Sequence, residues 1–182
     1  EERFKEIDNL DFQGDELLTN YYEEKKEIWR EAAQNLINLP SIVGQASNEN
    51  LLKVVEKCGI EQPVLAQRPT ARTDMPEDEQ YTHPWHQDWR AVQGSLNSVV
   101  FWIPLHDVSN INGTIEVKPG THKLGYMETE TLHNPTHFKI VDDRLEEYES
   151  VSMELDAGQI VVFSQFTAHK SGHNTSGRPR LT

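Results

Sequence analysis

The sequence contains one cysteine, Cys58, which excludes an intrachain disulfide and any zinc site built from several cysteines. We therefore expect a reducing compartment, with the cytoplasm as the default location. No stretch approaches the roughly 20 consecutive apolar residues that a membrane-spanning helix needs. The opening residues, Glu1–Lys5, are mostly charged, unlike the start of a secretory signal peptide.

Basic residues are also few. Lysine and arginine number 17 against 30 aspartates and glutamates, which gives a formal net charge of −13. A surface of that sign repels phosphate backbones and anionic lipid headgroups, so we expect neither a nucleic-acid partner nor a membrane partner. A local basic pocket is still compatible with this acidity, because net charge is summed over the whole molecule. The sequence does not determine the oligomeric state.

The 182 residues are enough for one domain, and its two parts differ in pattern. Residues 1–60 are predicted to be helical. From Asp15 to Leu39 apolar residues recur near a 3.6-residue period with charges on the opposite face, and Pro40 should end that helix. A second helix is expected over Asn48–Lys57, with Gly59 as its C-terminal cap.

Residues 61–182 carry short apolar runs separated by turn residues, a pattern typical of β-strands. The almost wholly apolar run Ser98–Leu105 suits the inside of a two-sheet sandwich or closed barrel. We predict a mainly β fold with N-terminal helices: a jelly-roll, or double-stranded β-helix, barrel of the cupin-like type. The expected strands are Pro63–Arg68, Thr82–Asp88, Asn97–His106, Thr114–Lys118, His137–Val141, Val151–Leu155, Gln159–Phe166 and a last run from about Arg178. That last run is cut short at Thr182, so we expect further chain beyond it.

The segment PWHQDWR, Pro84–Arg90, contains the first candidate site. In a strand, residues i and i+2 point to the same face, so His86 and Asp88 can offer an imidazole nitrogen and a carboxylate oxygen to one point. Such a pair is two-thirds of the 2-His-1-carboxylate triad that binds Fe(II) and leaves other positions open. The alternative is a chance HxD with a solvated or core histidine. His83, three residues before His86, should lie on the opposite face and be a poor ligand for the same metal.

The segment from Gln159 to Arg180 supplies the remaining candidates. An apolar strand should deliver His169 at its polar end, and the next strand should bring back Arg180, eleven residues later. The imidazole suits iron, and the fork-shaped guanidinium suits a bidentate contact with a carboxylate. Arg178 has the same strand parity and competes for this role. Pairing of Arg180 with a surface carboxylate is a further alternative.

Between these segments lies NGTIEVKPGTHKLG, Asn112–Gly125, in which Asn-Gly and Pro-Gly mark tight turns around a short strand, a hairpin pattern. Three motifs together resemble the phytanoyl-CoA dioxygenase family in order and approximate spacing: HQD at 86–88, this segment, and AHKSGHNTSGRPR at 168–180. The resemblance covers roughly Val64 to Thr182.

We predict one oxygenase domain over residues 1–182, with a helical part at 1–60 and a jelly-roll core at 61–182; the resemblance itself concerns the core. It implies a non-haem Fe(II), 2-oxoglutarate-dependent dioxygenase that uses O₂ to hydroxylate a small molecule, with release of succinate and CO₂. It assigns iron to His86, Asp88 and His169, and 2-oxoglutarate to Arg180, with support from Ser171 and Trp102. Relatives of this fold that halogenate carry a small residue in place of the carboxylate ligand, so Asp88 predicts hydroxylation.

Several further residues have candidate roles. Trp102 is equally well explained as a core aromatic on an apolar strand, and His122 of PGTH matches a family position with a structural or supporting role. Candidates for the substrate side are Arg72, Gln93 and Asn97. The histidines without a counterpart, expected on the surface or in loops, are His83, His106, His133, His137 and His173. The acidity of the chain argues against an anionic CoA ester as substrate.

Two other classes of protein compete with this interpretation. A cupin-like metal enzyme that does not use 2-oxoglutarate would need further histidine or glutamate ligands and would have no use for Arg180. A non-catalytic barrel that binds a small ligand would have an incomplete triad, whereas here all three residues are present.

Overall fold

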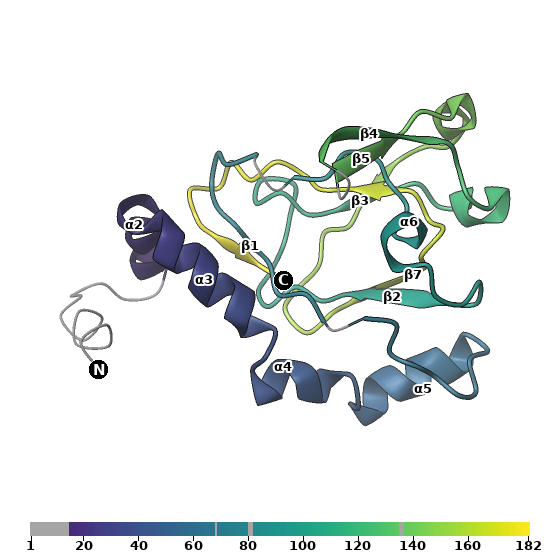
Figure 1. The fold of residues 1–182 in the computed structure, drawn as a ribbon, viewed down its shortest axis with the longest axis horizontal. Helices are drawn as coiled ribbons and strands as arrows, with labels where there is room; N and C mark the ends of the chain where they lie inside the picture. Colours follow the sequence, from purple (N-terminus) through teal and green to yellow (C-terminus); the bar gives the residue numbers. More distant parts are fainter. Residues whose placement is uncertain (1–14, 68, 80–81, 135–136) are drawn as a thin grey trace.

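The computed structural model describes residues 15–67, 69–79, 82–134 and 137–182. Four helices come first: α2 (Asp15–Glu24), α3 (Lys26–Leu36), α4 (Pro40–Gln45) and α5 (Glu49–Lys57). They run along one side of the strand-rich remainder (Figure 1). The single helix expected from Asp15 to Leu39 is therefore two helices, interrupted at Lys25. Pro40 begins α4, because a proline at the first helical position loses no hydrogen bond.

Helix α5 matches the prediction. Asn48 precedes it, and its side-chain oxygen accepts a hydrogen bond of 2.9 Å from the Asn50 N–H. After the last turn Gly59 has φ +80°, the left-handed conformation in which glycine ends many helices. The hydroxyl of Tyr22 in α2 donates to Asp78, which ties the helices to the rest of the chain. None of the described helices is long and apolar enough to cross a membrane.

The described residues form nine short strands that pair antiparallel in four small sheets, β1–β9, β2–β7, β6–β3–β8 and β4–β5. The strands are β1 (Thr73–Asp74), β2 (Val99–Trp102), β3 (Glu116–Val117), β4 (Thr129–Asn134), β5 (His137–Ile140), β6 (Val151–Ser152), β7 (Val161–Ser164), β8 (His169–Lys170) and β9 (Arg180–Leu181). Three short helices connect them: α6 (Trp89–Val92), η1 (Thr121–Leu124) and η2 (Asp143–Glu147). The fold is thus mainly antiparallel β with N-terminal helices, and the pairings of the described residues do not join into one closed barrel.

Six predicted strands each contain one observed strand, always shorter: β2, β3, β5, β6, β7 and β9. No strand forms over 63–67, where Val64 and Leu65 are 88% and 59% exposed and have no sheet to pack against. The predicted strand 82–88 has only an isolated bridge at His86 before α6 begins. Strands β1, β4 and β8 were not expected. The sequence of β4, TETLHN, is too polar for the apolar pattern. Arg68 and residues 1–14 of the predicted helical part lie outside the described residues.

The Asn-Gly and Pro-Gly segment is not a simple hairpin, since β3 pairs with β6 and β8, neither of which is its neighbour in the chain. Gly113 has φ +75°, and a Cβ there would lie 2.8 Å from the backbone nitrogen of Asn174. Glycine is therefore needed for a close approach to the segment that links His169 to Arg180. A backbone bridge between Asn112 and Asn174 holds the two segments together.

The buried core lies directly behind the candidate metal site. Its apolar cluster consists of Met127, Ile140, Leu145 and Ala168, with Trp85 and Leu124 packed against it. Trp85 and Ala168 immediately precede His86 and His169 in the sequence. Trp85 and Ala168 thus pack in the core, and the residue that follows each of them faces the candidate metal site.

Candidate metal centre

His86 and His169 lie opposite each other across an isolated antiparallel bridge. The backbone N–H of each donates to the carbonyl of the other, at 2.9 and 3.0 Å. Directly opposite residues in an antiparallel pair place their side chains on the same face. On its other edge His169 pairs with Val117 of β3, which fixes β8 from both sides. The backbone therefore brings the two imidazoles together, with ring centroids 4.1 Å apart.

Asp88 reaches the same point from the start of a helix. It has φ −64° and ψ −23°, precedes α6, and its side chain makes no capping hydrogen bond. Its Oδ1 lies 3.6 Å from Nε2 of His86 and 3.6 Å from Nε2 of His169. One potential ligand atom from each of the three residues lies within 4.8 Å of the others. The prediction that His86 and Asp88 alternate along a strand is wrong, because α6 begins directly after Asp88. The side chains of His86 and Asp88 nevertheless reach the same point.

Both histidines present the nitrogen that a metal would need. Nδ1 of His86 lies 2.8 Å from the carbonyl oxygen of Pro84, and Nδ1 of His169 lies 2.9 Å from that of Thr167. A carbonyl only accepts, so a neutral ring carries its proton on Nδ1 and keeps a lone pair on Nε2, toward Asp88. Hydrogen bonds of this kind orient metal-binding histidines. Two imidazole nitrogens and one carboxylate oxygen fit Fe(II).

The electrostatics favour the same protonation states. Burial, reinforced by His86, lowers the pKa of His169 to about 4, so this ring is uncharged at neutral pH. Burial alone would raise the pKa of Asp88, but the neighbouring His86 and His169 imidazoles bring the pKa below the usual value. A neutral imidazole and an ionised carboxylate are the forms that bind a metal.

His83 lies beside the site, contrary to prediction. Its ring centroid is 5.1 Å from that of His86, because residues 82–85 do not form a strand. Burial, with help from His86 and Arg72, lowers the pKa of His83 to about 4. Its ring also stacks on His137 at 5.3 Å. Among the described residues, the group that could hold a metal contains His86, Asp88 and His169 but not His83.

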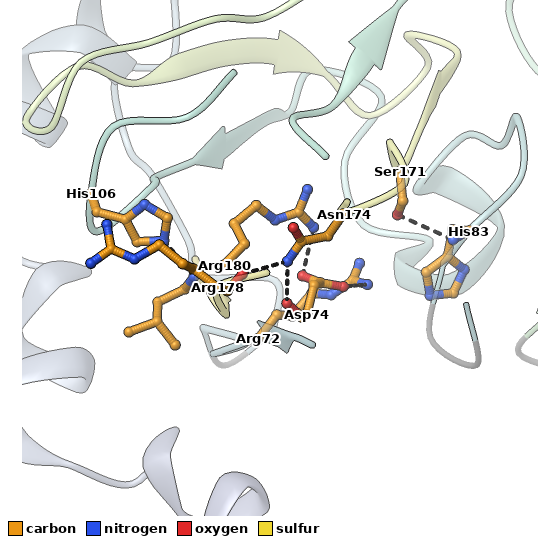
Figure 2. A network of polar contacts seen from close by, with 9 residues as sticks. Arg72, Asp74, His83, His106, Ser171, Asn174, Arg178 and Arg180 are labelled. Carbon is orange, nitrogen blue, oxygen red and sulfur yellow. Dashed lines mark hydrogen bonds and ion pairs between the residues drawn. The ribbon is translucent and has the colours of Figure 1, made fainter. Parts of the chain in front are cut away.

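Arg180 is buried, with 1% of its surface exposed, and it pairs in register with Asp74 of β1. Its Nη2 donates to Oδ2 of Asp74 at 2.5 Å, as Figure 2 shows. The guanidinium carbon lies 5.8 Å from the ring centroid of Trp102. Nε and Nη1 are buried without a hydrogen-bond partner. Buried guanidinium N–H groups without a partner suit a carboxylate as acceptor, so the residues present fit the distal end of 2-oxoglutarate.

The structure also separates the two competing arginines. Arg178 is exposed and lies outside the β1–β9 ladder, whereas Arg180 is inside it. Ser171 accepts a 3.1 Å hydrogen bond on its hydroxyl from the His83 N–H, and in Figure 2 this pair lies apart from the group around Asp74 and Arg180. A contact between Ser171 and 2-oxoglutarate stays a prediction. Trp102 is half-buried and faces the Arg180 guanidinium.

Other expected residues have different surroundings. His122 is exposed, and its neighbour Thr121 has the structural role instead: it is fully buried and accepts a 2.9 Å hydrogen bond from the Ala168 N–H. Gln93 and Asn97 are exposed. Arg72 is half-buried and pairs with Asp74 at 2.9 Å. The remaining histidines make contacts within the protein. Nε2 of His106 accepts a hydrogen bond from the Leu181 N–H (3.0 Å), and His173 pairs with Glu77 and Glu79 (3.2 and 3.3 Å). The ring of His133 contacts that of His137.

Three residues that sequence patterns missed hold the site together. Asp74 is shared by two arginines, Gln87 is fully buried between the candidate ligands, and the Asn174 side chain bonds the carbonyl oxygens of Asp74 and Arg178. Only Asn174 stands in a motif that could have drawn attention to it, the H-x-S…N-x-S…R pattern. The other two have polar side chains whose burial depends on distant segments.

Three solved structures have a similar fold. EvdO2 from Micromonospora carbonacea var. aurantiaca, complexed with 2-oxoglutarate, matches 61% of this chain at 22% identity with a TM-score of 0.51. AviO1 from Streptomyces viridochromogenes Tue57 matches 74% at 22% identity, also with a TM-score of 0.51. The epimerase SnoN, in complex with Fe³⁺, α-ketoglutarate and nogalamycin RO, matches 76% at 19% identity with a TM-score of 0.50.

The chain spans only part of these proteins: 46% of EvdO2, 54% of AviO1 and 58% of SnoN. No curated protein sequence matches the chain. A family match is nevertheless clear and covers nearly the whole chain. Residues 11–182 match the family described as phytanoyl-CoA dioxygenase (PhyH), and the chain therefore belongs to that family.

Proposed function

We propose that this protein is a non-haem Fe(II), 2-oxoglutarate-dependent dioxygenase that hydroxylates a small molecule. The observation that carries the proposal is the convergence of His86, Asp88 and His169, with both Nε2 atoms 3.6 Å from one carboxylate oxygen. Membership of the PhyH family and the ligands of two similar structures, 2-oxoglutarate in EvdO2 and Fe³⁺ with α-ketoglutarate in SnoN, support the same pair of cofactors.

Each residue has a definite task in this proposal. Iron would be held by Nε2 of His86, Nε2 of His169 and a carboxylate oxygen of Asp88. Arg180 would receive the distal carboxylate of 2-oxoglutarate on guanidinium N–H groups that have no partner in the protein, those of Nε or of Nη1. When bound, iron and 2-oxoglutarate supply the oxidising power for the reaction. Overall, substrate R–H, O₂ and 2-oxoglutarate would become R–OH, succinate and CO₂.

Asp88 is the reason to propose hydroxylation. A chloride-using relative needs a small residue at this position, so that the anion can take the place of the carboxylate. A second anion beside Asp88 would cluster negative charge in a partly buried site. Epimerisation, the reaction named for SnoN, is a different outcome on a related fold, and it would leave the mass of the product unchanged.

We also propose that the four sheets belong to one double-stranded β-helix barrel of the cupin-like type, in a single domain that includes the helices at 1–60. The substrate would be a small molecule other than a CoA ester, since the net charge of −13 opposes such an anion. The exposed, unpaired Cys58 suits a reducing compartment such as the cytoplasm.

Succinate formation tests the proposal. The protein is incubated with Fe(II), 2-oxoglutarate and O₂, with and without a panel of small molecules, and succinate, oxygen uptake and product mass are measured. The proposal expects succinate that requires iron and a product heavier by one oxygen atom. Oxygen uptake that ignores 2-oxoglutarate would indicate a cupin-like enzyme of another kind. Ligand binding with neither activity would indicate a non-catalytic barrel.

A further inference from the structure

The carboxylate of Asp74 is shared by two guanidinium groups (Figure 2). Its Oδ1 accepts from Nη2 of Arg72 at 2.9 Å, and its Oδ2 accepts from Nη2 of Arg180 at 2.5 Å. Asp74 is 7% exposed, and it lies directly opposite Arg180 in the β1–β9 ladder. Both ends of this carboxylate are therefore engaged, one by each arginine.

The contact with Asp74 occupies only one corner of the Arg180 guanidinium. Nε and Nη1 are buried and have no hydrogen-bond partner. A guanidinium is planar and rigid, so fixing Nη2 against Asp74, with Trp102 near its face, also fixes the directions in which the unpaired N–H groups point. An anion that binds Arg180 will therefore meet donors whose position is already set.

Asp74 is itself held in place. Nδ2 of Asn174 donates to the carbonyl oxygen of Asp74 at 2.9 Å and to that of Arg178 at 2.8 Å. One buried amide thus joins the Asp74 backbone to the chain just before Arg180. Next to Asp74, Arg72 exchanges two backbone hydrogen bonds with Thr182, at 2.7 and 3.0 Å. The carboxylate and the guanidinium are consequently fixed from both strands.

We propose that Asp74 is a positioning residue that sets which 2-oxo dicarboxylate the site accepts. It holds Arg180 so that the distal carboxylate is received at one fixed place relative to His86, Asp88 and His169, and a cosubstrate one methylene longer fits less well. This inference rests on the proposed function, since it assumes that 2-oxoglutarate binds between Arg180 and the metal.

If the site acted only through its net charge, replacing Asp74 would have the opposite effect on cosubstrate binding. Arg72, Asp74 and Arg180 together carry a net charge of +1, and Asp74 is the member that repels a dianionic cosubstrate. If only charge mattered, replacing Asp74 by a neutral residue would tighten binding. If positioning matters more, the same change weakens binding, because the guanidinium loses the acceptor that orients it.

Asp74→Asn and Arg72→Gln are the matched pair that separates the two explanations. Asp74→Asn removes a negative charge and one oriented acceptor. Arg72→Gln removes a positive charge, can still donate to Asp74, and leaves the contact between Asp74 and Arg180 in place. Positioning predicts a loss of affinity in Asp74→Asn and little change in Arg72→Gln, whereas charge predicts tighter binding in the first and weaker binding in the second.

The experiment is an anaerobic calorimetric titration of the Fe(II)-loaded protein with 2-oxoglutarate and with 2-oxoadipate. Wild type should prefer 2-oxoglutarate. Asp74→Asn should bind 2-oxoglutarate roughly tenfold or more weakly, the effect expected from losing a charge-assisted hydrogen bond. The ratio of its affinities for 2-oxoglutarate and 2-oxoadipate should be smaller than in wild type. Arg72→Gln should stay within about threefold of wild type, an effect of less than about 1 kcal/mol. Iron affinity, measured separately, should be unchanged in both variants, which shows that the metal centre is intact.

Unchanged or tighter binding by Asp74→Asn, or an equal loss in Arg72→Gln, would overturn the inference. Asp74→Glu is a second variant in case Asp74→Asn does not fold, since it keeps every charge but displaces the acceptor by one methylene. If Asp74 acts by positioning, Asp74→Glu should bind 2-oxoglutarate more weakly than wild type. If only charge matters, the affinity of Asp74→Glu should equal that of wild type. Failure of wild type to bind 2-oxoglutarate at all would instead refute the proposed function.

Discussion

The side chain of Gln87 accepts a hydrogen bond of 2.9 Å from the backbone N–H of Met127, and both residues are completely buried. The Gln87 amide nitrogen donates to the carbonyl oxygens of Gly125 (2.9 Å) and Phe166 (2.6 Å). One side chain between His86 and Asp88 thus joins the segment after η1 to the turn that leads into β8. Every donor of the amide is used, which is why a polar residue is tolerated at this depth.

We predict that Gln87→Met destabilises the protein by about 2–4 kcal/mol, because it leaves a buried N–H, a buried carbonyl and a part-buried carbonyl without these partners while keeping the volume of the side chain. Urea unfolding of the metal-free protein measures this. Gln93→Met is the matched control, since Gln93 is exposed and makes one long hydrogen bond of 3.4 Å. It should change stability by less than about 0.5 kcal/mol. Equal effects of the two substitutions would contradict this role for Gln87.

Alanine substitution of any candidate ligand should strongly weaken iron binding. We expect His86→Ala, Asp88→Ala and His169→Ala each to weaken Fe(II) affinity by more than about a hundredfold. This exceeds the effect of removing a hydrogen bond that merely orients a metal ligand. His122→Ala, which changes an exposed histidine, should bind iron as wild type does. Anaerobic metal titration gives the affinities. Normal affinity in any of the three ligand variants would remove that residue from the site.

Arg180→Ala should weaken 2-oxoglutarate binding by about two orders of magnitude, because a buried, charge-assisted contact with the distal carboxylate is lost. Arg178→Ala should have a small effect, since that residue is exposed and outside the β1–β9 ladder. Apparent KM for 2-oxoglutarate and direct titration should agree. A larger effect of Arg178→Ala would show that the two arginines have been assigned the wrong way round.

Acid should destabilise the metal-free protein. Burial is the main reason that the pKa values of His83 and His169 lie at about 4 in the folded chain, below the value of 6.5 for an unperturbed histidine. The unfolded chain therefore takes up protons first, so the stability is full above pH 6.5 and is lost as the pH falls toward 4. We expect the free energy of unfolding to fall by about 1–3 kcal/mol between pH 7 and 5.

Urea unfolding in the presence of a chelator measures this slope. His83→Gln should flatten it, because one of the histidines with a lowered pKa is removed. A slope that is identical in wild type and His83→Gln would show that His83 keeps an ordinary pKa in the folded protein.

Asp88 should also decide the atom that the substrate gains. Wild type, incubated with its substrate, iron, 2-oxoglutarate and excess chloride, is expected to add one oxygen atom. Asp88→Gly should abolish hydroxylation, because a ligand is lost. Mass spectrometry reads both results, and a chlorine isotope pattern in the wild-type product would be incompatible with Asp88 as a ligand.

The mainly β character of the chain and the residues that meet at the candidate metal centre were both predictable from the sequence. Alternating apolar runs and turn residues are local signals, and they located six of the strands. HxD and the later His169 were recognisable because they stand in three motifs that resemble the phytanoyl-CoA dioxygenase family in order and spacing. The local geometry was less well predicted: Asp88 starts α6, and His83 lies beside His86.

The tertiary structure alone decided which arginine is buried and what holds it. Arg178 and Arg180 have the same parity, so no periodicity separates them; pairing of β9 with β1 buries Arg180 against Asp74, 106 residues away in the chain. Gln87 is likewise matched with Met127, 40 residues away. Sequence patterns report how a segment folds locally. The burial and pairing of polar groups depend on which distant backbone segments pack together, and that is set only when the whole chain has folded.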